Sequence, residues 1–192
     1  ALLVALVCSA VWAGGTLKIA GSTTVLPLSQ VWAEEYMAKH PGVSISVSGG
    51  GTGVGISSLL NGSIDIANAS RPAKPKEIET AKVRNSKLVA TRLAKDGMAI
   101  IVNASNNVKN VTIGQLADVY MGRITNWKQL GGTSSKDIVV VGRDSSSGTY
   151  SFFQDEVLKG KPYTNSMLCL ASNKAVEQAV IQSKEAIGYV GI

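Results

Sequence analysis

Residues 43–60 read VSISVSGGGTGVGISSLL, and this stretch indicates the fold of the chain. Branched apolar residues alternate with Ser over 43–48, which predicts a strand, because successive side chains of a strand point to opposite faces. The glycine run 49–55 follows, and a short helical stretch through Leu59 and Leu60 comes after it. A strand, a glycine-rich loop and a helix in this order are typical of an α/β fold.

The same unit recurs along the chain. The segment LKIA at 17–20 predicts a strand, GSTT at 21–24 a loop, and the spacing of Leu28, Val31, Trp32 and Tyr36 a helix. Further strands are expected at 63–70, 97–103, 137–143 and 187–192, with an exposed connecting strand at 87–96. Further helices are expected at 74–83, around 113–120, from the 145–149 segment to about Leu158, and around 176–180.

We therefore predict an α/β protein of two lobes. The first lobe covers 16–90, the second 91–188, and residues 189–192 begin a crossover back to the first. A chain of 192 residues with 45% hydrophobic and 17% charged residues can bury a sizeable core, so a disordered tail is excluded.

The first thirteen residues, ALLVALVCSAVWA, form an uncharged apolar run. The run is shorter than the roughly 20 residues that span a bilayer, and small residues near its end, Val11 and Ala13, predict the remnant of a secretory signal. A buried N-terminal helix is the alternative. A lipid anchor on Cys8 is disfavoured, because Val7 and not a small residue precedes it. Export of the chain would leave Cys169 as a single thiol and no disulfide.

The charge of the chain suits an anionic ligand. The formal net charge is +6, and the basic residues are spread along the sequence rather than clustered. A groove for nucleic acid interleaves basic and aromatic side chains. With aromatic residues at only 5%, nucleic acid is not an expected partner.

Three loops that each follow a strand and precede a helix are candidates for an anion site. The first N–H groups of a helix are unpaired and carry a partial positive charge, glycine lets the backbone approach a ligand, and hydroxyls add donors. One such loop alone predicts no more than an N-cap. Three at the carboxyl ends of predicted strands favour a shared site. The candidates in these loops are Ser22, Thr23, Thr24, Gly51, Thr52, Gly53, Ser145, Ser147, Gly148 and Thr149.

Two arginines end strands beside these loops. Arg71 follows Ser70 at the end of the 63–70 strand, and Arg143 ends the strand before the third loop. A guanidinium group binds pairs of oxygens on phosphate or carboxylate. We add Ser70, Arg71 and Arg143 to the candidate ligand-binding residues. The alternative for each arginine is a solvated loop residue.

Motifs for enzymes fit less well. No Lys follows the glycine run, so a nucleotide P-loop is not supported, and Ser147 lacks the preceding Gly of G-x-S-x-G. The only His, His40, lies beside Pro41 without a partner motif, and no metal site or cofactor is expected. A secreted phosphatase using Ser147 or Thr149 remains the enzymatic alternative to a non-enzymatic binding protein.

An ordered set of motifs resembles the phosphate-binding protein family of the phosphate ABC transporter. The motifs are AGSTTVLPL (20–28), SGGGTGVGI (48–56), DIANASRP (65–72), DVYMGRITNWKQLGG (118–132), GRDSSSGTYSFF (142–153) and AIGYVGI (186–192). The resemblance implies a periplasmic-binding-protein fold of type II, in which the chain crosses twice between lobes. It also implies a segment beyond residue 192 that completes the first lobe.

The resemblance further implies a function. The protein would be a monomer in the periplasm or outside the cell that captures inorganic phosphate between its lobes and delivers it to a membrane permease. The implied phosphate contacts are Thr23, Thr24, Thr52, Ser70, Arg71, Arg143, Ser147, Gly148 and Thr149. Other oxyanions, such as sulfate, molybdate or tungstate, are the alternative ligands.

Two positions depart from the family. Some members have an acid at the positions of Arg71 and Ser145, where it accepts a hydrogen bond from protonated phosphate. Here neither position is acidic, and Asp144 is the nearest carboxylate that could substitute. Selectivity for phosphate over sulfate is therefore a hypothesis that depends on Asp144.

Overall fold

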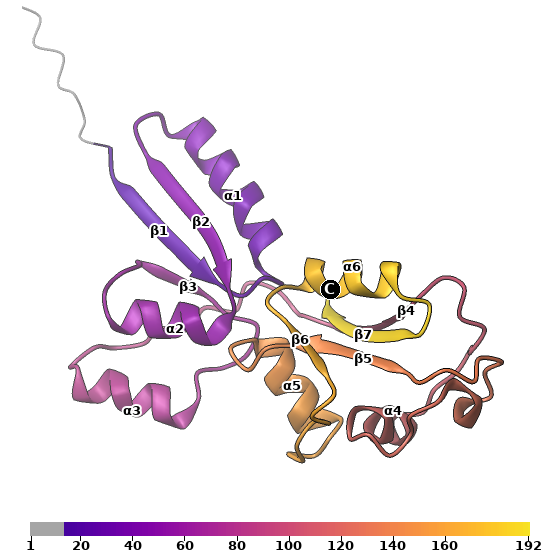
Figure 1. Cartoon of the computed structure of the whole chain (residues 1–192). Coiled ribbons are helices and arrows are strands. Elements are labelled where there is room, and N and C mark those ends of the chain that lie inside the picture. The colour runs from indigo at the N-terminus through magenta and orange to yellow at the C-terminus, as the bar shows by residue number, and fades with distance from the viewer. Residues whose placement is uncertain (1–13) are drawn as a thin grey trace, which may run out of the picture.

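A computed structural model describes residues 14–192, and the expected signal remnant and Cys8 lie outside these residues. The chain forms two α/β units that meet along one side (Figure 1). We call Thr16–Val83 lobe 1 and Met98–Gly191 lobe 2. Over residues 14–192, no helix is both long and apolar enough to cross a bilayer.

Lobe 1 is built on a three-stranded parallel sheet in the order β2-β1-β3. Its elements in chain order are β1 (Thr16–Gly21), α1 (Leu26–Lys39), β2 (Ser44–Gly50), α2 (Thr52–Leu60), β3 (Ile66–Asn68) and α3 (Pro75–Val83). Gly21 at the end of β1 is in register with Gly50 of β2 and Asn68 of β3. All three strands therefore end at one edge, and the loops that follow them begin side by side.

Lobe 2 contains a four-stranded sheet in the order β4-β7-β5-β6, in which only β4 is antiparallel. Its strands are β4 (Met98–Val102), β5 (Val139–Arg143), β6 (Leu168–Leu170) and β7 (Ala186–Gly191). Its helices are α4 (Ile113–Tyr120), the 3-10 helix η1 (Trp127–Leu130), α5 (Gly148–Glu156) and α6 (Asn173–Gln182). β5 runs toward lobe 1 (Figure 1), and β6 is parallel to it. Arg143 is the last residue of β5, and Leu170 is the last residue of β6.

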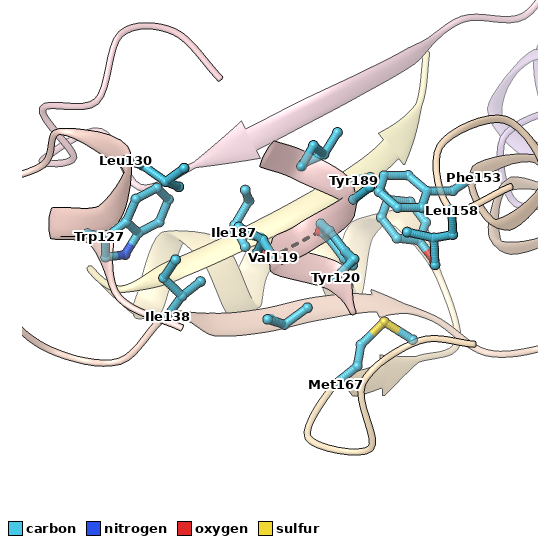
Figure 2. Packing of buried hydrophobic residues seen from close by; sticks show 13 residues of the cluster. Val119, Tyr120, Trp127, Leu130, Ile138, Phe153, Leu158, Met167, Ile187 and Tyr189 are labelled. Atoms are coloured by element: carbon cyan, nitrogen blue, oxygen red, sulfur yellow. Dashed lines mark hydrogen bonds between the residues drawn. The ribbon is translucent and has the colours of Figure 1, made fainter. Parts of the chain in front are cut away.

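The hydrophobic core of the described chain lies in lobe 2. Aromatic rings pack closely there: Phe153 stacks on Tyr189 with centroids 4.4 Å apart, and Tyr120 lies 4.5 Å from Phe153 (Figure 2). The buried Tyr120 hydroxyl donates to the carbonyl of Val141 at 3.0 Å, so its polar end is satisfied inside the core. This core fixes the strand that carries Arg143.

Lobe 1 buries fewer large hydrophobic side chains than lobe 2. Both hydrophobic clusters of the described residues belong to lobe 2, whereas the buried positions of α1 are the small residues Ser29 and Ala33. On the same helix Val31, Trp32 and Tyr36 are 43–55% exposed. The apolar spacing that predicted α1 is thus real, but these side chains face away from the lobe 1 sheet.

The structure corrects several predicted elements. Residues 87–96 form no strand; instead Gly97, just before β4, and Ile192, just after β7, exchange backbone hydrogen bonds at 3.5 and 3.0 Å. The strand expected over 63–70 is only the three-residue β3, and just before it the Asp65 carboxylate accepts from the N–H of Lys18 at 2.8 Å. The helix of the glycine run begins early, at Thr52, and β6 and η1 were not predicted. The boundary expected after residue 188 falls inside β7.

Candidate anion-binding site between the lobes

The predicted loops of the two lobes meet each other. The hydroxyls of Thr24 and Thr149 lie 3.4 Å apart, although 125 residues separate them. The N–H of Gly53 donates to the carbonyl of Ser146 at 2.8 Å, and the Ser146 hydroxyl donates to the carbonyl of Gly50 at 3.1 Å. The structure therefore brings the loops after β1, β2 and β5 into one site.

Close approach explains two of the glycines. A Cβ on Gly148 would lie 2.7 Å from Oγ1 of Thr52 and would also overlap the Ser70 hydroxyl. Gly51 has a φ of 91°, which L-residues rarely adopt, and a Cβ there would lie 2.5 Å from Oγ of Ser146. Glycine at these positions lets the lobes touch.

Several hydroxyl groups of the loops are buried. Oγ1 of Thr52, which is fully buried, accepts from the N–H of Ser70 at 3.1 Å and lies 3.2 Å from the Ser70 hydroxyl. Ser147 caps α5 by accepting from the N–H of Tyr150 at 3.3 Å. Oγ1 of Thr23 is buried and has no hydrogen-bond partner among residues 14–192. A buried hydroxyl without a partner is costly, so this group is available for a ligand.

The partial positive charges of the helix N-termini at the site are not neutralised by acidic side chains of the first turns. The first turns of α1, α2 and α5 contain no acidic side chain. Within the described chain, the backbone N–H groups of four residues donate to no acceptor: Thr23, Thr52, Gly148 and Thr149. These groups and the helix dipoles together form a concentrated set of donors, which suits an anion.

Arg143 lies in the protein interior at the end of β5, the strand that leads into the third loop. It is 1% exposed, and its main-chain N–H donates to the hydroxyl of Tyr189 at 3.2 Å. The guanidinium donates from Nε to the carbonyl of Leu170 at 3.2 Å, from Nη1 to Oδ1 of Asn173 at 2.8 Å and from Nη2 to the carbonyl of Ala171 at 3.0 Å. Three of its five N–H bonds are therefore used, and one on each terminal nitrogen remains.

The positive charge of Arg143 has no counter-ion within residues 14–192. All three acceptors of the guanidinium are neutral, and no carboxylate forms an ion pair with it. Burial lowers the pKa of Arg143, and the nearby Asp144 and Tyr189 act in the opposite direction. Because buried charges in proteins are normally paired, this arrangement favours binding of an anion.

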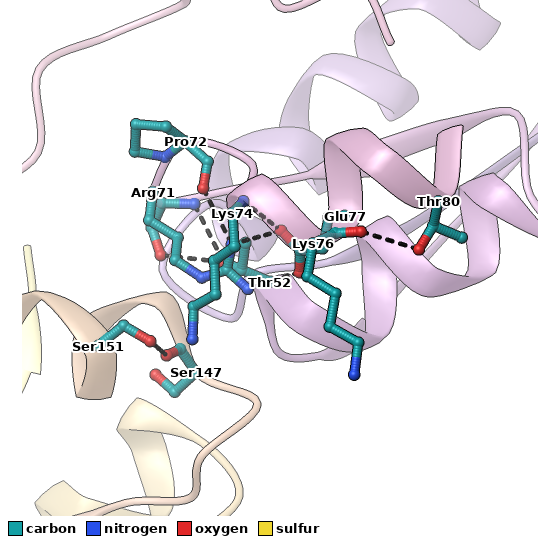
Figure 3. A network of polar contacts seen from close by, with 10 residues as sticks. Thr52, Arg71, Pro72, Lys74, Lys76, Glu77, Thr80, Ser147 and Ser151 are labelled. Atoms are coloured by element: carbon teal, nitrogen blue, oxygen red, sulfur yellow. Dashed lines mark hydrogen bonds and ion pairs between the residues drawn. The ribbon is translucent and has the colours of Figure 1, made fainter. Parts of the chain in front are cut away.

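Arg71 is placed differently. Its Nη1 and Nη2 donate to the two carboxylate oxygens of Glu77, each at 2.9 Å (Figure 3). Burial acts to raise the pKa of Glu77, but hydrogen bonds from Arg71 and from the N–H of Lys74 outweigh it and lower the pKa. The charge of Arg71 is thus already neutralised. Its Nη2 nevertheless lies 3.6 Å from where a Cβ on Gly53 would be, at the edge of the site.

The positions that depart from the family are also accounted for. Ser145 is exposed. One carboxylate oxygen of Asp144, Oδ1, accepts from the N–H of Ser146 at 2.9 Å and from the Ser146 hydroxyl. Asp144 therefore holds the loop that carries Ser146 to lobe 1, and its Oδ2 has no hydrogen bond within the described residues.

Two further residues of the site were not predicted, Ser146 and Asn173. Asn173 begins α6 immediately after Ser172, whose hydroxyl caps the helix by accepting from the N–H of Ala175 at 3.1 Å. The sequence signal was the segment LASN (170–173), a fourth hydroxyl-bearing loop between a strand and a helix. Its β6 strand is only three residues long, and this is why the unit escaped notice.

A cavity of about 110 Å³ adjoins the site at the end of the segment that connects lobe 1 to lobe 2. Ser70 and Thr149 line it together with Asp96, Gly97, Met98 and Phe152. A larger cavity, of about 330 Å³, lies away from the site between α2 and α3 of lobe 1. The smaller cavity is the one in contact with the predicted ligand residues.

Comparison with known proteins supports the architecture. The PBP superfamily domain matches residues 10–192. The phosphate-binding protein PstS of Bacillus subtilis is 36% identical over 93% of this chain and 57% of its own length, and PstS of Staphylococcus epidermidis is 35% identical over 92% and 54%. The chain spans about half the length of the curated relatives it matches.

Solved structures agree with the relatives. A phosphate ABC transporter substrate-binding protein from Clostridium perfringens, solved with bound phosphate, matches 93% of this chain and 71% of its own with a TM-score of 0.85 and 35% identity. An ABC-type phosphate transport receptor from Vibrio cholerae matches with a TM-score of 0.63 and 34% identity over 93% of this chain and 72% of its own. With its two sheets, its interlobe loops and this match, the chain belongs to the PBP superfamily, among relatives that are phosphate-binding proteins.

Proposed function

We propose that this protein is an extracytoplasmic solute-binding protein that captures inorganic phosphate between lobes 1 and 2. The observation that carries the proposal is the buried guanidinium of Arg143, which faces neutral acceptors only and lies beside open helix N-termini. A tetrahedral oxyanion supplies both the missing negative charge and acceptors for the unpaired N–H groups.

The choice of phosphate rests on the relatives. The relatives named above are phosphate-binding proteins, and the TM-score of 0.85 to a phosphate-bound structure extends over both lobes. Sulfate, molybdate and tungstate present the same tetrahedral oxygens and are the alternative ligands. A titration of the purified chain with phosphate and with sulfate, by calorimetry, decides between them. A preference for sulfate would overturn the choice.

Selectivity is assigned to Asp144. Protonated phosphate can donate a hydrogen bond to a carboxylate, whereas sulfate has no proton to offer, and Oδ2 of Asp144 is without a partner in the described chain. Asp144→Asn removes the carboxylate while its remaining carbonyl oxygen can still accept from Ser146. We expect this variant to lose part of its preference for phosphate over sulfate, measured by competition between the two anions.

Binding would proceed by closure. Thr23, Thr24 and Thr52 belong to lobe 1, and Arg143, Gly148 and Thr149 to lobe 2, so only an arrangement with the lobes in contact presents all donors to one anion. The ligand then stabilises the closed state because that state makes more contacts with it. The antiparallel pair of connections at Gly97 and Ile192 is the proposed hinge. The closed form would be recognised by the membrane permease of an ABC transporter.

The central test of the proposal is Arg143→Ala. Loss of a charged hydrogen-bond partner is worth about 1.5 to 3 kcal/mol, so the affinity for phosphate should fall by about one to two orders of magnitude. Arg123→Ala is the matched control, since Arg123 is an exposed arginine paired with Asp118 at 3.0 Å on the surface of lobe 2. Unchanged phosphate binding by Arg143→Ala would show that the site is elsewhere.

Turnover of a phosphate ester would distinguish an enzyme from a binding protein. A secreted phosphatase would use the hydroxyl of Ser147 or Thr149, but Ser147 already serves as the cap of α5. We propose a binding protein without catalytic activity, which leaves a chromogenic phosphate ester intact while binding free phosphate.

Sedimentation of the chain tests the expected monomer, and fractionation of cells tests export to the periplasm or medium.

A further inference from the structure

We propose that Asn173 is a positioning residue that orients Arg143 and locks the two lobes together when the anion is bound. The inference rests on the proposed function, and it assigns a role to a residue outside the loops that the sequence pointed to. Asn173 is 8% exposed and lies at the start of α6, next to the interlobe junction.

The side chain of Asn173 binds three separate parts of the protein. Its Oδ1 accepts from Nη1 of Arg143 at 2.8 Å, within lobe 2. Its Nδ2 donates to Oγ1 of Thr24 at 3.1 Å, in lobe 1, and lies 3.3 Å from the carbonyl of Gly191, at the end of β7. One amide thus connects the buried cation, the opposite lobe and the hinge.

The two ends of the amide have different roles. The contact between Oδ1 and Nη1 lies within lobe 2 and persists whether the lobes are open or closed, so it fixes the direction in which the guanidinium presents its free N–H bonds. The contact between Nδ2 and Thr24 joins different lobes and exists only while they touch. The first contact prepares the site, and the second is lost on opening.

The surroundings of Thr24 show that this contact is built into the closed form. A Cβ on Gly191 would lie 2.7 Å from Cγ2 of Thr24, so a residue other than glycine would push Thr24 away from Asn173. The Thr24 hydroxyl also lies 3.4 Å from that of Thr149. Thr24 therefore sits between Asn173 and the first turn of α5, and a bond from the amide holds it there.

The test compares phosphate binding to a set of variants with binding to the parent chain, using calorimetry for affinity and a chase of labelled phosphate for the dissociation rate. Asn173→Ala should weaken phosphate binding about tenfold, as expected when one or two hydrogen bonds are lost. Most of this change should appear as faster dissociation, because the lobe-to-lobe bond must break for release. A residue that serves folding alone would not shift the dissociation rate selectively.

Asn173→Asp separates the two roles and covers the case in which the alanine variant fails to fold. Aspartate keeps an acceptor for Arg143, but it cannot donate to Thr24 or Gly191, and its charge neutralises the guanidinium. We expect this variant to unfold at a temperature no lower than the parent and to bind phosphate at least tenfold more weakly. Parent-like phosphate binding by Asn173→Asp would overturn the proposal.

Thr24→Val completes a double-mutant cycle. If Asn173 acts through Thr24, this substitution accelerates dissociation in the parent chain and has a smaller effect in the Asn173→Ala background. Equal effects in both backgrounds would overturn the lock between the lobes. Lys174→Ala is the control, because Lys174 is the next residue of α6 and its exposed side chain pairs only with Glu177.

The outcome distinguishes this inference from the proposed function. If the parent chain binds sulfate in place of phosphate, the assigned ligand is wrong, and the same variants measured with sulfate decide the role of Asn173. If the parent binds neither anion, both proposals fall. If the parent binds phosphate and Asn173→Ala binds it with the same rates, only the role of Asn173 is refuted.

Discussion

Gly148→Ala is the sharpest perturbation that this site offers. Gly148 is the first residue of α5, and alanine is a better helix former than glycine, so the substitution should not weaken lobe 2. Its new Cβ, however, would lie 2.7 Å from Oγ1 of Thr52 and 3.2 Å from the carbonyl carbon of Ser70, and both of these atoms belong to lobe 1. The overlap therefore disfavours the contact between the lobes.

The expected magnitude follows from the cost of overpacking. An extra methyl group forced into a close-packed contact costs about 1 to 3 kcal/mol, and here this cost applies only to the closed form. Phosphate affinity should fall about 10- to 100-fold, while the unfolding temperature without phosphate should be unchanged or higher. Calorimetry and thermal unfolding followed by circular dichroism measure the two quantities.

The matched control is Gly114→Ala in α4. Gly114 is also near the start of a helix, and the nearest atom to its Cβ position is Oγ1 of Thr112, at 4.0 Å. This variant should bind phosphate as the parent does. The closure argument is refuted if Gly148→Ala binds phosphate with parent affinity, or if its loss of affinity is matched by an equal loss of stability.

Two further predictions concern titration. Because the pKa of Glu77 is lowered in the folded state, its contribution to stability is present above the ordinary value of 4.5 and is lost as pH falls through the folded pKa. Glu77→Gln should therefore lower the free energy of unfolding by about 1 to 3 kcal/mol at neutral pH. Urea unfolding should show that the difference between this variant and the parent becomes smaller in acid. Burial raises the pKa of Tyr189 from 10.0 to about 12, so its contribution is complete below pH 10.0 and is lost between there and about 12. Urea unfolding across this interval should show stability falling, with up to ~1.4 kcal/mol per pH unit of the fall due to Tyr189 itself, and a Tyr189→Phe variant should lose less stability than the parent.

The strand and loop order was open to prediction because it is local. Alternating residues in 43–48, glycines at 49–55 and hydroxyls before helices each express a backbone preference that neighbouring residues determine. The structure accordingly contains β2, α2 and α5 where the sequence predicted them, within a few residues. The prediction of a strand at 87–96 was wrong because a strand needs a hydrogen-bonded partner, and among residues 14–192 no backbone segment pairs with 87–96; the first pairing is that of Gly97 with Ile192.

The difference between the two arginines was not visible in the sequence. Both lie at or just after the end of a strand and precede a helix. Arg71 pairs with Glu77, six residues later, whereas the acceptors of Arg143 are carbonyls and an amide 27 to 30 residues away. No local pattern encodes which charge is neutralised. That depends on which side chains the packed lobes bring within hydrogen-bond distance.

By itself, the sequence determined the alternation of strands and helices and the Ser, Thr and Gly loops at the strand ends. It predicted an anion as the class of ligand, because helix N-termini and hydroxyls offer hydrogen-bond donors. Tertiary structure alone decided that Thr24 meets Thr149, that Arg143 is buried without a counter-ion among the described residues, and that Asn173 joins it to the other lobe. These are contacts between residues up to 149 positions apart, and only the packing of two sheets can bring them together.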